Sequence, residues 1–159
     1  MKNRYELEPG DLGSIIRLHG TLYAQEFKLD QTFEGYVAAG MGEFAKQFDP
    51  AKDFVCVVED DNEKIVGSIF IMGLPDKTAQ LRWFLLHPDA RGSGLGRILL
   101  TEAIKFCRDR NFKSICLWTI GELTKAANLY RSAGFTLTEE KMRDIWGDVR
   151  KEQRYDLIL

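Results

Sequence analysis

The chain has 159 residues, 45% of them hydrophobic, with a formal net charge of −2 and an isoelectric point near 5.8. This length and hydrophobic content predict one compact domain over residues 1–159, with a core of ordinary size. The charge lacks the basic excess that is typical of proteins that bind nucleic acids, so we expect no nucleic acid partner.

Neither a membrane segment nor a secretion signal is visible. No run is long and apolar enough to cross a bilayer, and the N-terminal stretch MKNRYELEPGD lacks the apolar core of a signal peptide. The three cysteines, Cys56, Cys107 and Cys116, are odd in number and lack metal-ligand spacing. We therefore expect a cytoplasmic protein with reduced thiols, no membrane partner and no metal site.

The first 50 residues are predicted to form a short strand and two helices. YELEPGD (5–11) is typical of a short strand closed by a Pro-Gly turn, with Asp11 placed to cap a helix. A stripe of residues at helical spacing then predicts a helix, and this stripe is apolar at its start and polar at its end. Its members are Leu12, Ile15, Ile16, His19, Leu22, Tyr23 and Glu26. A second apolar stripe predicts a helix that ends at Asp49-Pro50, formed by Phe33, Val37, Met41, Phe44 and Phe48.

The pattern then changes to strands. DFVCVVE (53–59) and KIVGSIFIM (64–72) are β-branched and aromatic runs that predict a hairpin, and TAQLRWFLL (78–86) adds a third antiparallel strand. A helix from Leu95 to about Asn111, a strand at 113–119 and a helix at 123–133 follow. Strands at 135–140 and 152–159 end the chain, joined by a polar segment at 142–149. The fold class is therefore α+β, with a mixed, mostly antiparallel sheet flanked by helices as an α/β sandwich.

One junction between a predicted strand and a predicted helix carries three glycines at alternate positions. LHPDARGSGLGR (86–97) places Gly92, Gly94 and Gly96 where unpaired helix amides attract phosphate, and Arg91 adds a fixed positive charge. Glycines let the backbone approach such an anion closely. The spacing is neither that of a dinucleotide-binding Rossmann loop nor that of a Walker loop. The junction predicts a diphosphate site, and a turn that serves helix packing alone is the alternative.

Two motifs together give a resemblance to a known family. LHPDARGSGLG resembles the acetyl-CoA signature of the GCN5-related N-acetyltransferases (GNAT), with Arg91, Gly94 and Gly96 at the three defining positions. AANLYRSAGF (126–135) is similar to the second hallmark of that family, and the order of the predicted elements fits its fold along nearly the whole chain. A narrower likeness, in PGDLGSIIRLHGTLYAQEF, LRWFLLHPDARGSGLG and LWT, is to the acetyltransferase half of bacterial MarR–GNAT fusion proteins. We expect no DNA-binding half here.

The resemblance implies direct transfer of an acetyl group from acetyl-CoA to a primary amine. Backbone groups of Phe84, Leu85 and Leu86 are implied to hold the pantetheine arm. The implied diphosphate loop consists of Arg91, Gly92, Ser93, Gly94, Leu95 and Gly96. Asn128 and Arg131 are further candidates for cofactor contacts. Tyr130 matches the tyrosine that serves many members as general acid, and the alternative for Tyr130 is a core aromatic residue on an amphipathic helix.

The amine side is predicted from the first helical stripe. Glu26 ends that stripe and is the candidate base, while His19 and Tyr23 lie on the same face and are candidates for lining the amine pocket. The alternatives are a solvated Glu26 and a His19 satisfied inside the core. Trp118 ends a strand and is a further candidate for the pocket, with a plain core role as the alternative.

The acceptor is predicted to be a small-molecule amine. Two alternatives stay open at this point: acetylation of a protein or peptide amine, and a catalytically silent acyl-CoA sensor. A homodimer is a further expectation, since the family often forms one.

Overall fold

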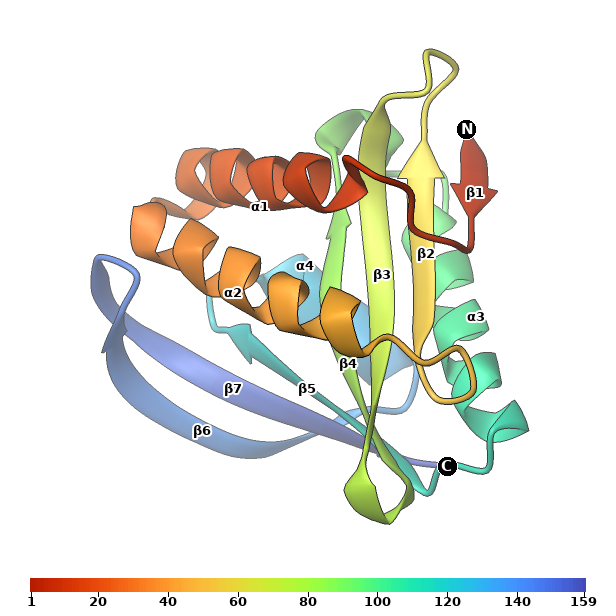
Figure 1. The fold of residues 1–159 in the computed structure, drawn as a ribbon. Helices are drawn as coiled ribbons and strands as arrows, with labels where there is room; N and C mark the ends of the chain where they lie inside the picture. The colour runs from red at the N-terminus through yellow and green to blue at the C-terminus, as the bar shows by residue number, and fades with distance from the viewer.

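The computed structural model describes residues 1–159 and is built on a seven-stranded sheet of order β1-β2-β3-β4-β5-β7-β6 (Figure 1). The strands are β1 (Lys2–Arg4), β2 (Phe54–Glu59), β3 (Ile65–Leu74), β4 (Thr78–Leu86), β5 (Ser114–Ile120), β6 (Thr136–Ile145) and β7 (Asp148–Ile158). Every neighbouring pair is antiparallel except β4 and β5, which are parallel. The predicted mixed, mostly antiparallel sheet is confirmed.

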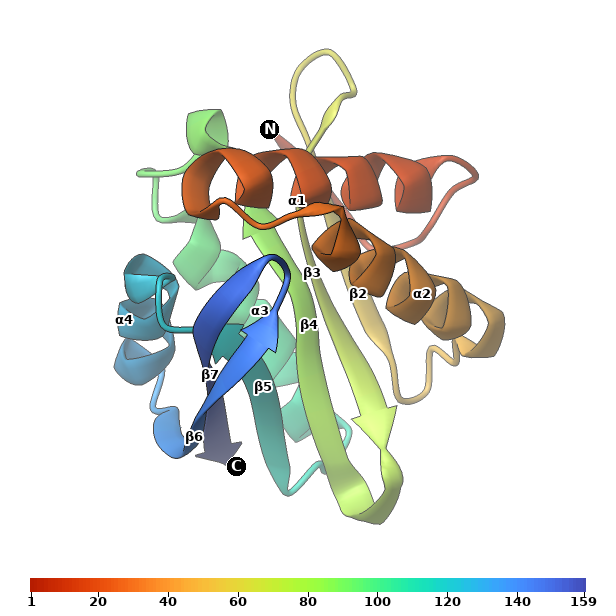
Figure 2. The ribbon, with the colours of Figure 1, turned by 90° about the vertical axis from the view of Figure 1, so that its left-hand side faces the viewer.

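Four helices cover the two faces of this sheet: α1 (Asp11–Phe27), α2 (Gln31–Gln47), α3 (Leu95–Asp109) and α4 (Thr124–Ser132). Helices α1 and α2 lie on one face, and α3 and α4 lie on the other (Figures 1 and 2). Each helix pair encloses its own apolar core against the sheet, one around Ile15, Met41 and Phe70, the other around Leu99, Ile115 and Tyr155. None of the helices has the length and apolar character needed to span a bilayer.

The predicted stripe of α1 is confirmed, but the start of this helix is not capped as expected. Its N-cap is Gly10, which has a left-handed φ of 97° and makes no side-chain cap. The Asp11 carboxylate instead accepts hydrogen bonds from Arg4 at 2.8 and 3.0 Å and from the Glu8 amide at 2.6 Å. Arg4 also binds Glu59 on β2, so this buried network ties α1 to the sheet edge.

Two strand boundaries also differ from the prediction. The first strand lies at Lys2–Arg4, where it pairs with Glu59, Val58 and Val57, because Pro9 and Gly10 belong to the turn before α1. The polar segment at 142–149 is not a connection but the tip of the β6–β7 hairpin, turned by Trp146 and Gly147 with φ of 56° and 99°. Most of β6 is exposed, so the segment lacks the alternating apolar residues by which strands are predicted.

Strands β4 and β5 pair only at their first residues and then separate. The parallel ladder joins Thr78–Gln80 to Ser114–Cys116 and goes no further. Beyond it, the β3–β4 register shifts between Ser68 and Phe70, and Trp83 adopts a left-handed φ of 48°. The buried Ser68 hydroxyl donates to the Trp83 carbonyl at 2.7 Å and holds this bulge. The later residues of β4 therefore have no strand partner on the β5 side.

We expect Asp11→Asn to lower the free energy of unfolding at pH 7 by about 1–3 kcal/mol, because Arg4 loses a charged partner. Burial by itself raises the pKa of Asp11, but the hydrogen bonds from Arg4 and the Glu8 amide outweigh it, so the pKa is lowered from 3.8. Stability from a lowered carboxyl pKa is present above the unfolded-state pKa and is lost as pH falls through the folded-state pKa.

Urea unfolding of the wild type and of Asp11→Asn, at pH 7 and at steps below pH 4, measures the difference between their free energies of unfolding. We expect this difference to become smaller as the pH falls. Asp61→Asn is the control, since that side chain is 95% exposed and its loss should change stability by less than about 0.5 kcal/mol. A difference that is independent of pH would contradict the role of the Asp11 charge.

Candidate active site

Two cavities meet where β4 and β5 part. The first, here called the loop groove, has about 650 Å³ and runs along the 91–97 segment, the end of β4 and the start of α4. The second, here called the inner pocket, has about 340 Å³ and is enclosed by α1, α2 and strands β4 to β7. Four residues line both cavities: Tyr23, Phe84, Leu123 and Tyr130. A molecule in one cavity therefore reaches the other only at these four side chains.

The loop groove presents open backbone at the start of α3. Gly92 and Gly94 both have a left-handed φ of 82°, and a Cβ built at either position meets no atom within 4 Å. Gly94 is the N-cap of α3, and no side chain caps this helix end. The amides of Leu95 and Gly96 thus have no backbone partner, and they lie at the positive end of the helix dipole. Gly96 differs, because its Cβ would touch Leu129 and Leu86 at 3.5 Å, so it serves helix packing.

Arg91 is held at the mouth of the loop groove by two partners. Its Nε donates to the Leu86 carbonyl at 2.8 Å, and its two terminal nitrogens donate to the Glu26 carboxylate at 2.8 and 3.2 Å. Both side chains are partly exposed, at 37% for Arg91 and 27% for Glu26. The guanidinium is therefore fixed where an anion bound to the glycine loop would meet it.

Most predicted cofactor residues line the loop groove, namely Phe84, Leu85, Leu86, Arg91, Gly92, Gly94 and Gly96. Ser93, Leu95, Asn128 and Arg131 do not; Leu95 packs on the core, and Arg131 donates to the Tyr155 hydroxyl at 2.9 Å. Two cations in the groove, Arg97 and Lys125, were missed by the sequence analysis. No motif distinguished them from the solvated Lys and Arg residues of the same helices.

Tyr130 stands at the meeting point of the two cavities. The ring is buried among Phe84, Phe135 and Tyr155, with centroid distances of 6.3, 5.9 and 6.2 Å. Burial, with a smaller contribution from Tyr23, raises the pKa of the Tyr130 phenol well above 10. The phenol therefore keeps its proton at neutral pH, as a hydrogen-bond or proton donor must.

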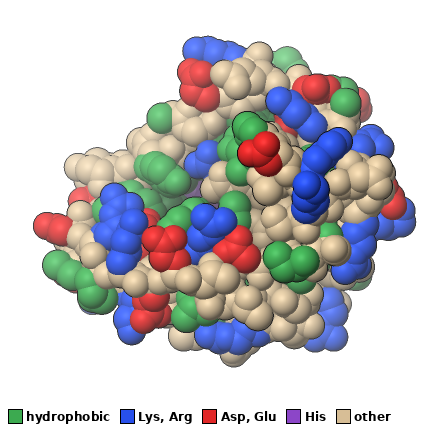
Figure 3. Space-filling view, turned by 90° about the horizontal axis from the view of Figure 1, so that it is seen from below, with side chains coloured by type: hydrophobic (Ala, Val, Ile, Leu, Met, Phe, Trp, Pro, Cys, Tyr) green, Lys and Arg blue, Asp and Glu red, His purple; other side chains and the backbone are tan.

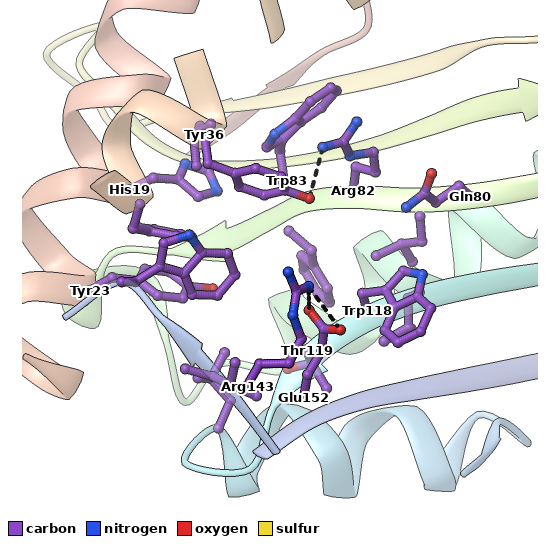
Figure 4. Close-up of a pocket in the computed structure, with 18 of the residues that line it drawn as sticks. His19, Tyr23, Tyr36, Gln80, Arg82, Trp83, Trp118, Thr119, Arg143 and Glu152 are labelled. Atoms are coloured by element: carbon purple, nitrogen blue, oxygen red, sulfur yellow. Dashed lines mark hydrogen bonds and ion pairs between the residues drawn. The ribbon is translucent and has the colours of Figure 1, made fainter. Parts of the chain in front are cut away.

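His19 and Tyr23, the two predicted pocket residues of α1, both line the inner pocket (Figure 4). The His19 Nδ1–H donates to the Ile15 carbonyl at 2.9 Å, which leaves Nε2 as an acceptor. Burial lowers the pKa of His19 to about 4, so the ring is neutral at physiological pH. Tyr23 stacks on His19 at 5.9 Å, and burial followed by the charge of Glu26 raises the pKa of Tyr23 to about 12.

Glu26 does not join His19 and Tyr23 in the inner pocket. It lies one turn beyond Tyr23 on α1 and lines only the loop groove, because its carboxylate is bound by Arg91. Trp118, by contrast, lines the inner pocket from β5, and this residue is 37% exposed. The structure thus brings together three of the four residues that were predicted on the amine side.

The carboxylate of the inner pocket is Glu152, which the sequence analysis missed. Its residue is buried on β7, and its carboxylate accepts from Arg143 Nη1 at 3.0 Å and lies 3.8 Å from Lys141 Nζ (Figure 4). Glu152 was placed in a predicted terminal strand, but strand periodicity does not show which cavity a side chain faces. Seen from below, basic and acidic side chains alternate beside a hollow that shows hydrophobic side chains (Figure 3).

No thiol is available at either cavity. Cys56 and Cys107 are buried, and burial raises the pKa of each to about 12; burial also raises the pKa of Cys116. None of the three lines the loop groove or the inner pocket. A covalent intermediate on cysteine has no support in this geometry.

The comparisons with known proteins agree with this arrangement. The model of the acetyltransferase (GNAT) family matches residues 21–135. An uncharacterized N-acetyltransferase of Schizosaccharomyces pombe is 29% identical over 119 residues, which is 74% of this chain and 72% of that protein. N-acetyltransferase 8B of Homo sapiens is 30% identical over 94 residues, but this stretch spans only 41% of that protein.

Solved structures show the same fold over nearly the whole chain. An acetyltransferase from Streptococcus agalactiae superposes with a TM-score of 0.77 at 27% identity, covering 99% of this chain and 98% of that one. Spermidine N-acetyltransferase from Vibrio cholerae, solved with CoA and spermine, gives 0.73 at 21% identity, covering 99% and 94%. The chain belongs to the GNAT family and is an N-acetyltransferase.

We expect Gly94→Val to raise the dissociation constant for CoA at least ~10-fold, about 1.4 kcal/mol, because valine strains the left-handed backbone and covers the amides. Gly10→Val is the matched control, because Gly10 is also a helix N-cap with a positive φ of 97° and nothing within 4 Å of its Cβ position. Gly10 lies outside the loop groove. Calorimetry with CoA measures both variants. Equal CoA affinity in the folded Gly94 variant and the wild type would remove the loop from the cofactor site.

Proposed function

We propose that the protein transfers the acetyl group of acetyl-CoA to a primary amine of a small molecule bound in the inner pocket. The single observation that carries this proposal is the meeting of the two cavities at Tyr130 and three neighbours. The loop groove offers helix amides and Arg91 to a diphosphate, and the inner pocket has the size of a small-molecule site.

The proposed reaction needs no covalent enzyme intermediate. The amine nitrogen attacks the thioester carbonyl carbon, the carbon–sulfur bond breaks, and the nitrogen loses a proton while the leaving sulfur gains one. Holding both reactants at one junction supplies the proximity that such a direct attack requires. The Tyr130 phenol is the proposed donor of the proton to sulfur.

The unpaired edge of β4 is proposed to hold the pantetheine arm. Phe84, Leu85 and Leu86 line the loop groove on the side where β5 has moved away. Their peptide groups on that side need partners, and the amides of an extended arm supply them in the manner of an added strand.

Glu152 replaces Glu26 as the proposed carboxylate for the amine. Glu152 lines the inner pocket, whereas Glu26 lines the loop groove and is bound to Arg91. Glu152 is proposed to attract the ammonium and to accept its proton through water.

Four further expectations stay predictions of this proposal: a cytoplasmic location, a homodimer, the absence of nucleic acid and membrane partners, and the narrower likeness to MarR–GNAT fusion proteins. The volume of the inner pocket, about 340 Å³, favours a small amine over a protein amine. Release of CoA thiol, measured over a panel of small primary amines, tests the proposal. CoA binding without release for any amine would reject the proposal.

We expect Tyr130→Phe to reduce kcat at least ~10-fold while CoA affinity changes little, because the ring and its packing stay. Tyr155→Phe is the matched control: that ring lies 6.2 Å away in the same core, and its hydroxyl binds Arg131 outside both cavities. Steady-state kinetics across the pH range compares the two variants. A wild-type kcat for Tyr130→Phe at every pH would return Tyr130 to a core role.

Two carboxylate variants separate the two cavities. Glu26→Gln frees the Arg91 guanidinium and removes a negative charge beside the loop, so we expect the CoA dissociation constant to fall by up to about fivefold. Glu152→Gln should instead lower kcat/KM for the amine by about 10-fold or more and leave CoA affinity unchanged. Calorimetry and amine kinetics on both variants provide the test. The reverse pattern would place Glu26, and not Glu152, at the amine.

A further inference from the structure

The inner pocket carries more positive than negative charge. Its charged lining consists of Arg82, Lys141 and Arg143 against a single carboxylate, Glu152, since His19 is neutral. The ion pairs of the pocket join Glu152 to Lys141 and Arg143, and none of them includes Arg82. One guanidinium of the pocket therefore has no counter-charge.

Arg82 nevertheless has a fixed position. The guanidinium lies over the Trp83 ring at 4.3 Å, and its Nη2 donates to the Tyr36 hydroxyl at 3.3 Å (Figure 4). The bulge at Trp83 brings these two successive side chains together. The guanidinium contacts the faces of the aromatic rings, so N–H donors of Arg82 stay free to bind another group.

A glycine on α2 makes room for this arrangement. A Cβ at Gly40 would lie 2.9 Å from Arg82 Nη2 and 3.1 Å from the Trp83 ring. Gly42, on the same helix, has nothing within 4 Å of its Cβ position. The guanidinium is thus seated against α2 backbone at a place that any larger residue would fill.

We infer that the acceptor is a primary amine that also carries an acidic group, a carboxylate or a phosphonate, and that Arg82 binds this group as a specificity-determining residue. A half-buried guanidinium without a carboxylate is a forked receptor for an anion. The acceptor's ammonium lies toward Glu152 and Tyr130. Polyamines, which carry only positive charge, are disfavoured by this pocket. The inference rests on the proposed function and narrows its substrate class.

The test measures CoA-thiol release with matched amines. Glycine, β-alanine, 4-aminobutyrate and aminomethylphosphonate are compared with glycinamide, β-alaninamide, 4-aminobutyramide and spermidine. We expect kcat/KM for at least one acidic amine to exceed that for its neutral counterpart by about 10- to 100-fold, the range of a charged hydrogen bond. Arg82→Met should abolish this preference while activity toward the amides persists, and Arg82→Lys should retain part of it.

Gly40→Ala should weaken the preference in the same direction by displacing the guanidinium, and Gly42→Ala should leave it unchanged. Thermal unfolding confirms that each variant is folded. The inference is overturned if the wild type prefers amides or spermidine. It is also overturned if Arg82→Met and Gly40→Ala lose kcat/KM equally for acidic amines and for amides. Either result leaves the proposed function standing. CoA binding without release for any amine overturns the proposed function, and the inference with it.

Discussion

The early end of the β4–β5 ladder is the constraint on which the whole site depends. Two neighbouring parallel strands normally remain paired along their length, but here the ladder stops at Gln80 and Cys116. The space between the parted strands becomes the two cavities, and the later peptide groups of β4 are left without a strand partner on that side. The bulge at Trp83, held by Ser68, turns β4 at the point where this happens. A straight β4 paired fully to β5 would leave room for neither cavity.

The remaining elements position side chains around that opening. Helix α4 carries Tyr130 into the junction, and α3 begins beside it with uncapped amides. On the other side, the β6–β7 hairpin lines the inner pocket. Arg150 of this hairpin donates hydrogen bonds to the carbonyls of Phe27 and Lys28 at the end of α1. The inner pocket is thus assembled from segments spread between residues 19 and 152, which explains why no single motif describes it.

The loop groove was predictable from the sequence because most of its features are local. Gly92, Gly94 and Arg91 lie within four residues, and local backbone conformation determines what the two glycines offer. The helices were predictable for the same reason, since the apolar stripes of α1 and α2 repeat at helical spacing. Asp11 shows the limit: its residue type fits a cap, but Arg4, seven residues earlier at the end of β1, binds the carboxylate instead.

The inner pocket was harder to predict because it depends on contacts between distant segments. Glu26 has the right helical face for the inner pocket, yet Arg91, 65 residues away, binds it in the other cavity. Glu152 and Arg82 sit in strands whose periodicity was recognised, but the parting of β4 and β5 decides which space they face. The meeting of the two cavities at Tyr130 is likewise a property of the assembled sheet.

The most direct measurement of the central claim is a crystal structure of the protein with CoA bound. We expect the diphosphate to lie on the amides that follow Gly92 and Gly94, and the pantetheine arm to run along the free edge of β4. The thiol should end beside Tyr130, with the inner pocket open beyond it. A thiol that ends away from Tyr130, or a CoA molecule bound outside the parted strands, would contradict this expectation.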